Sequence, residues 1–352
     1  MAVPPEPIGR PITKVSFPFT GARSFGSHFG SNPGHLRMLK FVPPGLRALS
    51  PLVVVLHGCG QTAHDINDGL GWSTLANECG FALLLPEQRR SNNAQRGFNW
   101  FRPADSRRGC GEALSIVQMV QQLIDDHGLD SRRVYVTGSS AGGAMASGLL
   151  AAYPDVFAGG AVLAGLPFGV ASNLWGALAA MKGKVNRSAA ELGDQVRAAS
   201  PHRGRWPVLS IWHGGSDKTV APSNADAIIR QWCNVHGLCE GAAIETRVAG
   251  KTRRLWCDDS GFPVIERFVI PGMGHGAPVD ALGTSGYAYG AAAPFFEDKG
   301  ISSTYHIAKF WGLLRSARDS AIRPPARRET QSGNRGGLAD DMKRRAHLAT
   351  YE

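Results

Sequence analysis

The segment Val134–Ala146, with the sequence VYVTGSSAGGAMA, carries the most information about the fold of this chain. A β-branched apolar run leads into G-x-S-x-G at Gly138, Ser140 and Gly142, and small helix-forming residues follow. In this context the motif predicts a sharp strand-to-helix turn that exposes the serine hydroxyl as a nucleophile. Glycines are needed on both sides because side chains there would crowd the neighbouring strand and helix. The alternative is an ordinary glycine-rich turn.

A nucleophilic serine needs a base, and the base needs an acid that orients it. The apolar run Pro207–Trp212 predicts a buried strand, and the loop after it contains Asp217. Pro222 opens the next predicted helix, which places Asp226 inside that helix. We therefore predict Asp217 as the acid, with a turn residue or helix cap as the alternative for this position.

The base is predicted in the loop after the next strand. Val264–Ile270 alternates in the way a half-buried strand does, and Pro271–Gly276 follows it directly. Within that loop, His275 has a glycine on each side, so the backbone can turn its imidazole back towards the serine. His236 falls at a predicted helix end and His306 in a predicted helix. We predict His275 as the base.

An oxyanion hole needs two backbone N–H groups, one of them from the residue after the nucleophile. That residue is Ala141. Leu52–Leu56 predicts a strand buried on both faces, and the loop His57–Gln61 follows it. The glycines beside Cys59 allow its backbone to approach a substrate oxygen, so we predict Cys59 as the second donor. His57 is interpreted as a structural histidine, with a second base as the alternative.

Strands and helices alternate along most of the chain, which predicts an α/β fold with a doubly wound, mostly parallel sheet. Residues 166–205 interrupt this rhythm with two predicted helices and are expected to form a cap over the active site. The expected elements are strands at 36–42, 51–56, 81–85, 133–136, 160–164, 207–212 and 264–270, a hairpin at 244–257, and helices near 70–79, 111–127, 141–152, 173–182, 189–199 and 304–314.

Composition excludes several classes of protein. The 352 residues contain six cysteines, too few for a disulfide scaffold, although a Cys239–Cys257 or Cys233–Cys257 bridge is a possible alternative to free thiols. No run of residues reaches the ~20 apolar residues of a membrane span. We find no metal-ligand cluster, no cofactor motif and no nucleic-acid motif. We therefore expect no cofactor, no metal and no nucleic-acid partner.

The two ends of the chain differ from its middle in composition. Residues 1–27 are expected to form an irregular arm that has no signal-peptide pattern, which favours a cytoplasmic location. Residues 315–352 hold nine Lys or Arg and five Asp or Glu, about +4 of the total charge of +10. This tail is expected to be disordered and solvated, with attachment to an anionic surface as the alternative. Residues 28–314 are expected to be the catalytic domain.

From about residue 28 to 313 the chain resembles the polyhydroxybutyrate depolymerase family of esterases, which includes feruloyl- and acetylxylan-esterase-like members. The resemblance implies an α/β-hydrolase fold, an acyl-serine intermediate, Ser140, Asp217 and His275 as the triad, and Cys59 in the oxyanion loop. It also suggests an extracellular location as the alternative. The runs that carry it are Leu56–Thr62, Gly71–Trp72, Leu85–Gln88, Phe98–Phe101, Gly109–Ile116, Val134–Met145, Tyr153–Phe157, Ala164–Pro167, Gly272–Gly276 and Gly300–Tyr305.

One position departs from the family pattern. Many members carry a cysteine just before the Phe-Asn-Trp-Phe run, and this chain has Gly97 there. A disulfide between Cys59 and that position is therefore not available. Among the tryptophans near the predicted site, Trp72 and Trp212 are more typical of core packing. Trp100 is predicted to contribute to an apolar wall for the substrate.

The expected function is hydrolysis of short hydroxyalkanoate esters, as poly(3-hydroxybutyrate) or its oligomers. The absence of a separate polymer-binding domain favours soluble oligomers or amorphous polymer. The alternatives are an esterase on feruloyl or acetyl esters of plant polysaccharide, an acyltransferase that uses the same acyl-enzyme, and a non-catalytic binding protein on a hydrolase scaffold. An intact set of Ser140, Asp217 and His275 argues against the last of these. The sequence leaves the oligomeric state undecided.

Overall fold

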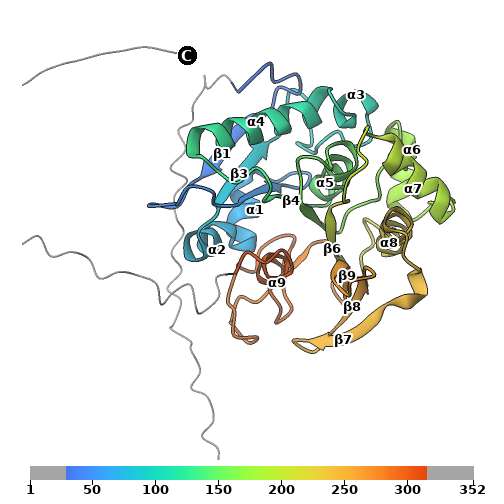
Figure 1. Cartoon of the computed structure of the whole chain (residues 1–352). Coiled ribbons are helices and arrows are strands. Elements are labelled where there is room, and N and C mark those ends of the chain that lie inside the picture. Colours follow the sequence, from blue (N-terminus) through green and yellow to red (C-terminus); the bar gives the residue numbers. More distant parts are fainter. Residues whose placement is uncertain (1–28, 315–352) are drawn as a thin grey trace, which may run out of the picture. The chain divides into compact units, whose positions relative to one another are not determined.

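A nine-stranded sheet runs through residues 29–314, the part of the chain that the computed structural model describes (Figure 1). Its strand order is β1-β3-β2-β4-β5-β6-β9-β8-β7. The predicted arm 1–27 and tail 315–352 lie outside the described residues. The strands are β1 Arg37–Phe41, β2 Leu52–Leu56, β3 Ala82–Glu87, β4 Val134–Ser139, β5 Gly159–Leu163, β6 Val208–Gly214, β7 Ile244–Val248, β8 Lys251–Cys257 and β9 Pro263–Ile270.

The six neighbouring strands from β3 to β9 are parallel, and antiparallel strands lie only at the two sides of the sheet. The chain first adds β3 on one side of β2 and then β4 on the other. Strand order therefore reverses between β2 and β4, and ligands of open α/β sheets bind at the carboxyl ends of the strands near such a reversal. The predicted doubly wound, mostly parallel sheet is confirmed.

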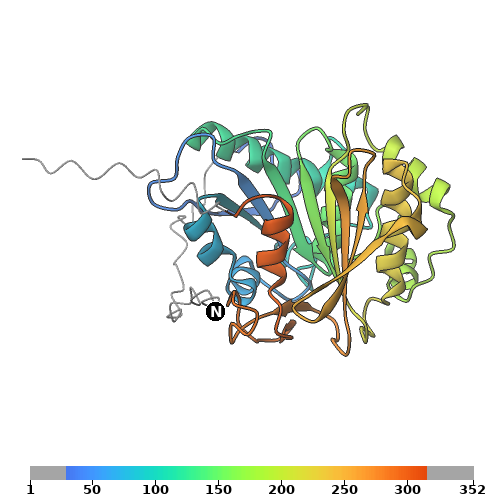
Figure 2. The ribbon, with the colours of Figure 1, turned by 60° about the horizontal axis from the view of Figure 1, so that its bottom comes forward.

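Helices cover both faces of this sheet and bury two separate apolar cores. Side chains of α4, α5 and α8 belong to the core on one face, and side chains of α1, α2 and α9 belong to the other (Figures 1 and 2). The helices are α1 Ala63–Leu70, α2 Trp72–Cys79, α3 Pro103–Ser106, α4 Gly111–His127, α5 Ala141–Ala152, α6 Leu174–Met181, α7 Ala189–Ala198, α8 Ser223–His236 and α9 Ser303–Phe310.

One helix was not predicted. The helix expected near 70–79 is present as α2, and the unpredicted α1 precedes it; Gly71, whose φ of 72° is left-handed, separates the two. Thr62 starts α1 with a capping box, because its side chain accepts from the Asp65 N–H while the Asp65 carboxylate accepts from the Thr62 N–H. The capping signal was present in the sequence, but the short amphipathic run after it was not recognised.

The segment between β5 and β6 contains the two helices that the sequence predicted, α6 and α7. The α7 helix packs on α8, and its Val196 side chain joins the core beneath the sheet. The carboxyl end of α6 instead contacts the loop after β6, where the Ala221 N–H donates to the Met181 carbonyl at 2.7 Å. A capping role for residues 166–205 therefore rests on α6 more than on α7.

Two further features complete the fold. The predicted hairpin is present as the antiparallel pair β7 and β8. A short parallel pair that the sequence did not predict, β10 Ala277–Val279 and β11 Phe296–Asp298, follows the His275 loop.

Within residues 29–314 no disulfide joins any of the six cysteines. No helix in this part of the chain is both long enough and apolar enough to cross a membrane.

Candidate active site

Ser140 occupies a strained turn between β4 and α5. Its φ of 56° and ψ of −117° are unfavourable for a residue with a side chain, so the surrounding backbone must enforce them. A Cβ added at Gly138 would lie 2.4 Å from the Gly142 backbone, and one added at Gly142 would lie 2.2 Å from the Leu56 carbonyl oxygen. These contacts explain why glycine is required at both positions, as the motif predicted.

The structure brings Ser140, His275 and Asp217 into one hydrogen-bonded chain. The Ser140 hydroxyl donates to His275 Nε2 at 2.9 Å, and His275 Nδ1–H donates to Asp217 Oδ2 at 2.7 Å. The three residues follow the carboxyl ends of β4, β6 and β9, so parallel strands deliver them to one edge of the sheet. In this geometry the imidazole can accept the serine proton while the carboxylate stabilises the resulting cation.

The Asp217 carboxylate accepts hydrogen bonds from several neighbouring groups. Its Oδ1 accepts from the backbone N–H groups of Thr219 and Val220 at 2.8 and 2.9 Å. The buried His213 Nε2 lies 2.9 Å from the Val220 carbonyl and 3.4 Å from Asp217 Oδ2. Burial alone would raise the pKa of Asp217, but hydrogen bonds from His213 and His275 outweigh burial and hold that pKa well below its usual range. The carboxylate therefore stays charged beside the imidazole.

The sequence did not identify His213 as part of this site. It is the sixth residue of β6, and a histidine at the end of a buried strand resembles an ordinary core residue. The signal that was available is its position four residues before Asp217, at the end of the strand that leads into the Asp217 loop. Asp226, the acid that the sequence set aside, lies on α8 and forms an ion pair with Arg267 at 2.8 Å. Among the described residues it is Asp217, and not Asp226, that hydrogen-bonds to His275, which agrees with the choice of Asp217.

The loop after β2 runs beside Ser140. A Cβ added at Gly97 would lie 2.3 Å from Cys59 Sγ and 3.6 Å from the Ala141 Cβ, so these three residues are neighbours. Gln61 holds the loop, because its side-chain oxygen accepts from the Gly58 N–H at 2.8 Å. Within residues 29–314, the Cys59 and Ala141 N–H groups donate to no carbonyl or side-chain oxygen. Both are therefore available to an incoming substrate oxygen.

His57 helps to hold the loop after β2 in place. It is fully buried, its Nδ1–H donates to the Gly58 carbonyl at 2.9 Å, and its Nε2 accepts from the Gln88 N–H at 3.0 Å. Both nitrogens are thus engaged in contacts with the backbone. Burial also lowers the pKa of His57, so the ring is neutral. These contacts match the interpretation of His57 as a structural histidine.

A buried carboxylate, Glu112 at the start of α4, joins the same support. Its Oε1 accepts from the side chains of Gln88 and Asn99 at 2.5 and 2.6 Å, and its Oε2 accepts from the Asn99 N–H at 2.8 Å. Burial raises the pKa of Glu112 to about 7, although hydrogen bonds from Asn99 and Gln88 act in the opposite direction. Through Gln88 this cluster reaches His57 and the loop that contains Cys59. No pattern in the sequence indicated this cluster of Glu112, Gln88 and Asn99.

Trp100 is half-buried and packs at the edge of a small apolar cluster that includes Ala144 of α5 and Val220 of the Asp217 loop. This position is next to the Ser140 site, and contact with a substrate stays a prediction. Trp72 and Trp212 are fully buried core residues.

Residues 29–314 contain no group of three or more His, Cys, Asp or Glu side chains placed to hold a metal ion.

The fold and this arrangement of side chains define an α/β-hydrolase of the esterase type. The family model described as Esterase PHB depolymerase matches residues 36–256. The chain is 44% identical over 289 residues to poly(3-hydroxyalkanoate) depolymerase C of Paucimonas lemoignei, covering 82% of this chain and 69% of the relative. The protein belongs to the Esterase PHB depolymerase family and is a carboxylic ester hydrolase.

Other relatives act on different esters according to their names. The chain is 35% identical over 267 residues to feruloyl esterase B of Talaromyces stipitatus, and the matched region covers 72% of this chain and 72% of the relative. The solved structure of acetyl xylan esterase from Aspergillus awamori superimposes with a TM-score of 0.68 at 24% identity, covering 81% of this chain and 97% of that one. This last likeness supports the fold.

Proposed function

We propose that the protein hydrolyses esters of short hydroxyalkanoates, the repeating units of poly(3-hydroxybutyrate), through an acyl-enzyme on Ser140. The observation that carries the chemistry is the hydrogen-bonded chain from Ser140 through His275 to Asp217 on a strained strand-to-helix turn. The substrate class rests on the relative from Paucimonas lemoignei, which is named as a poly(3-hydroxyalkanoate) depolymerase.

The first half of the reaction forms the acyl-enzyme. Ser140 Oγ attacks the ester carbonyl carbon and gives its proton to His275 Nε2, while Asp217 stabilises the imidazolium. The carbonyl oxygen becomes an oxyanion that accepts hydrogen bonds from the Cys59 and Ala141 N–H groups. When the C–O bond breaks, the departing alkoxide takes the proton from His275 Nε2 and leaves as an alcohol.

The second half of the reaction releases the acid. A water molecule gives one proton to His275 Nε2 and attacks the acyl carbon, and the same two N–H groups hold the new oxyanion. The bond to Ser140 Oγ then breaks, and the proton returns from His275 to that oxygen. The hydroxy acid leaves and the resting site is restored.

Exposed apolar side chains on α6 support an oligomeric or polymeric substrate. Leu174, Trp175 and Leu178 are 55, 81 and 46% exposed on a helix whose carboxyl end contacts the Asp217 loop. On another side of the site, the half-exposed Phe295 ring lies 6.4 Å from the His275 ring. Exposed apolar groups of this kind suit contact with an apolar polyester chain.

The alternative function is an esterase on feruloyl or acetyl groups of plant polysaccharide. Feruloyl esterase B of Talaromyces stipitatus and acetylxylan esterase of Coprinopsis cinerea, 35 and 31% identical to this chain, favour it. A release assay with p-nitrophenyl butyrate, hydroxybutyrate oligomers, amorphous polymer and methyl ferulate distinguishes the two. A higher kcat/KM on methyl ferulate than on the oligomers would reject the hydroxyalkanoate assignment.

The nucleophile is tested by Ser140→Ala on p-nitrophenyl butyrate. We expect kcat to fall by a factor of the order of 10³–10⁶, because only binding and the oxyanion donors remain. Ser147→Ala is the matched control, since Ser147 lies on the same helix and its buried hydroxyl has no hydrogen-bond partner among the described residues. More than a tenth of the wild-type activity in Ser140→Ala would show that another residue is the nucleophile.

A further inference from the structure

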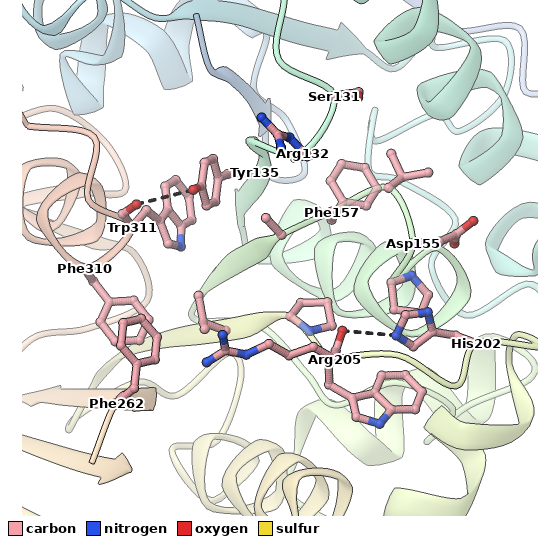
Figure 3. Close-up of a pocket in the computed structure, with 16 residues that line it drawn as sticks. Ser131, Arg132, Tyr135, Asp155, Phe157, His202, Arg205, Phe262, Phe310 and Trp311 are labelled. Carbon is pink, nitrogen blue, oxygen red and sulfur yellow. Dashed lines mark hydrogen bonds between the residues drawn. The ribbon is translucent and has the colours of Figure 1, made fainter. Parts of the chain in front are cut away.

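A second pocket, of about 500 Å³, lies at the opposite edge of the sheet from Ser140 (Figure 3). Its lining includes the residues that lead into or begin β4, β5, β6 and β9, among them Arg132, Ala158, Val208 and Phe262. The Ser140 site instead follows the carboxyl ends of these strands. Five to eight residues at ~3.3 Å each separate the two edges, so roughly 15–25 Å of sheet lies between the two sites.

The walls of this pocket are largely aromatic. Tyr135 and Trp311 line one side and stack with ring centroids 4.9 Å apart. Phe310 and Phe262 also line the pocket, and Phe262 is 48% exposed. Pockets of this size with apolar walls and a few polar groups are typical of small-molecule sites. The walls therefore suit a ligand with an apolar chain or ring.

Two arginines give the pocket its charge. The Arg205 guanidinium lies over the Phe262 ring at 5.2 Å and makes one ion-pair contact with Asp258 at 3.2 Å. Arg132 contacts Asp130 through Nε alone, at 3.3 Å. A guanidinium has five N–H donors, so each arginine keeps donors for a ligand. The arginines thus offer bidentate sites that match a carboxylate.

The acidic residue in the lining is already neutralised. Both oxygens of Asp155 accept from the Arg108 guanidinium, at 2.6 and 2.7 Å. Hydrogen bonds from Arg108 lower the pKa of Asp155, so the carboxylate stays ionised and paired with that guanidinium. Asp155 therefore opposes an incoming anion less than an unpaired carboxylate would.

A buried donor in the same wall has no acceptor. Trp311 is only 6% exposed, and its indole Nε1–H donates to no acceptor among the described residues. This nitrogen is itself buried, so Trp311 contributes to the pocket through its aromatic ring.

We propose that this pocket binds a carboxylate with an apolar chain or ring, of the size of a ten-carbon fatty acid. The aromatic walls take the apolar part, and the arginines at the rim, Arg205 foremost, take the carboxylate. The proposal goes beyond the ester chemistry at Ser140 and does not depend on it.

The test uses the full chain and isothermal titration calorimetry with decanoate. We expect decanoate to bind, with decanol and acetate each at least about tenfold weaker, because each lacks one half of the recognised group. Arg205→Met should weaken decanoate by about tenfold, and Arg132→Met by a smaller factor. Arg254→Met is the matched control, since Arg254 is also ion-paired with an acid, Glu245, and does not line the pocket.

A steric variant separates the pocket from the Ser140 site. Ala158 is exposed within the pocket lining, so Ala158→Trp should fill the space and abolish decanoate binding. Both Ala158→Trp and Arg205→Met should keep kcat/KM on p-nitrophenyl butyrate within about twofold, whatever residue performs the chemistry. Decanoate affinity that neither variant changes, or decanol that binds as tightly as decanoate, would overturn the proposal.

Discussion

Asp217 and Glu112 are both buried carboxylates near Ser140, and their environments move their pKa values in opposite directions. Asp217 faces His213, His275 and two backbone N–H groups, and its pKa is lowered. Glu112 faces the neutral amides of Gln88 and Asn99, and burial raises its pKa to about 7. The difference shows that the number of donors does not decide the shift, since each carboxylate accepts several. Burial raises the pKa of both groups; at Asp217 hydrogen bonds from two histidines outweigh it, whereas at Glu112 the amide donors do not, and the nearby Asp105 raises the pKa further.

The two clusters accordingly suit different tasks. Beside the proposed nucleophile, a permanently charged Asp217 can stabilise an imidazolium that forms during the reaction. Glu112 instead cross-links the start of α4 to the loop of Gln88 and Asn99, and through Gln88 to His57. Its effect on the reaction is therefore indirect, through the position of the Cys59 loop.

The largest expected effect that separates the two clusters is on kcat. Asp217→Asn should lower kcat on p-nitrophenyl butyrate by a factor of the order of 10³–10⁴, because an amide neither stabilises the cation nor fixes the tautomer of His275. Asp226→Asn is the matched control and should lie within about twofold of wild type, since Asp226 pairs with Arg267 on the surface of α8. Equal losses in the two variants would remove Asp217 from its proposed role.

Glu112→Gln should have a smaller effect on kcat and a clear effect on stability. The substitution places an amide N–H₂ among groups that are all donors, so at least one buried donor loses its acceptor. We expect a loss of about 1–3 kcal/mol in the free energy of unfolding, measured with urea, and a decrease in kcat of about tenfold or less. KM should change little if the cluster acts through the oxyanion loop. A decrease in kcat as large as that of Asp217→Asn would contradict the division between the two clusters.

The pH dependence of stability sharpens the comparison further. A raised folded pKa means that the folded state holds the Glu112 proton more tightly than the unfolded chain, whose value is ~4.3. This contribution is present below about pH 4.3 and is lost as pH rises to about 7. The lowered pKa of Asp217 gives the opposite sign, and its contribution is lost only as pH falls below about 4.

Between about pH 5 and 7, buried histidines such as His236 and His306 also titrate on unfolding, but they are common to wild type and Glu112→Gln, so the difference between the two proteins should come from Glu112. The unfolding free energy of wild type relative to Glu112→Gln should fall by about 1–3 kcal/mol over this interval. Glu191→Gln is the control, because hydrogen bonds from Ser188 lower the pKa of this exposed residue and place its titration below the interval. A difference between wild type and Glu112→Gln that is constant with pH would show that Glu112 does not titrate there.

The smallest expected effect concerns Trp100, which lies between the two clusters. It follows Asn99 in the chain and packs near Val220 of the Asp217 loop. If the ring lines the acyl pocket, Trp100→Phe should raise KM for p-nitrophenyl butyrate by about three- to tenfold and leave KM for the acetate nearly unchanged. Equal changes for both esters would indicate that Trp100 acts in packing alone.

Much of the proposed site was predictable because its signals are local. The strand, turn and helix around Ser140 need glycine at 138 and 142, and this requirement can be read from adjacent residues. Asp217 and His275 each follow a strand in a loop with small residues. In a parallel sheet, loops after neighbouring strands meet at one edge, so the order of elements was enough to bring the three residues together.

Other features depend on residues whose proximity no local pattern encodes. Glu112, Gln88 and Asn99 each look like ordinary polar residues in the sequence, and only packing of α4 against the loop before it makes them one buried cluster. The His213 contact with Asp217 needed the turn after β6 to be known. The boundary between the unpredicted α1 and the predicted α2 depended on the left-handed conformation of Gly71.

The sequence by itself determined the alternation of strands and helices, the strained serine turn and the order of nucleophile, acid and base, because each follows from periodicity or from the steric needs of neighbouring residues. Only the tertiary structure decided the opposite pKa shifts of Asp217 and Glu112 and the pocket between Arg132 and Trp311. A pKa shift depends on burial and on partners from distant elements. A pocket depends on which distant side chains leave space unfilled, and Arg132 and Trp311 line the same pocket only because the sheet and the segment after α9 bring them to it.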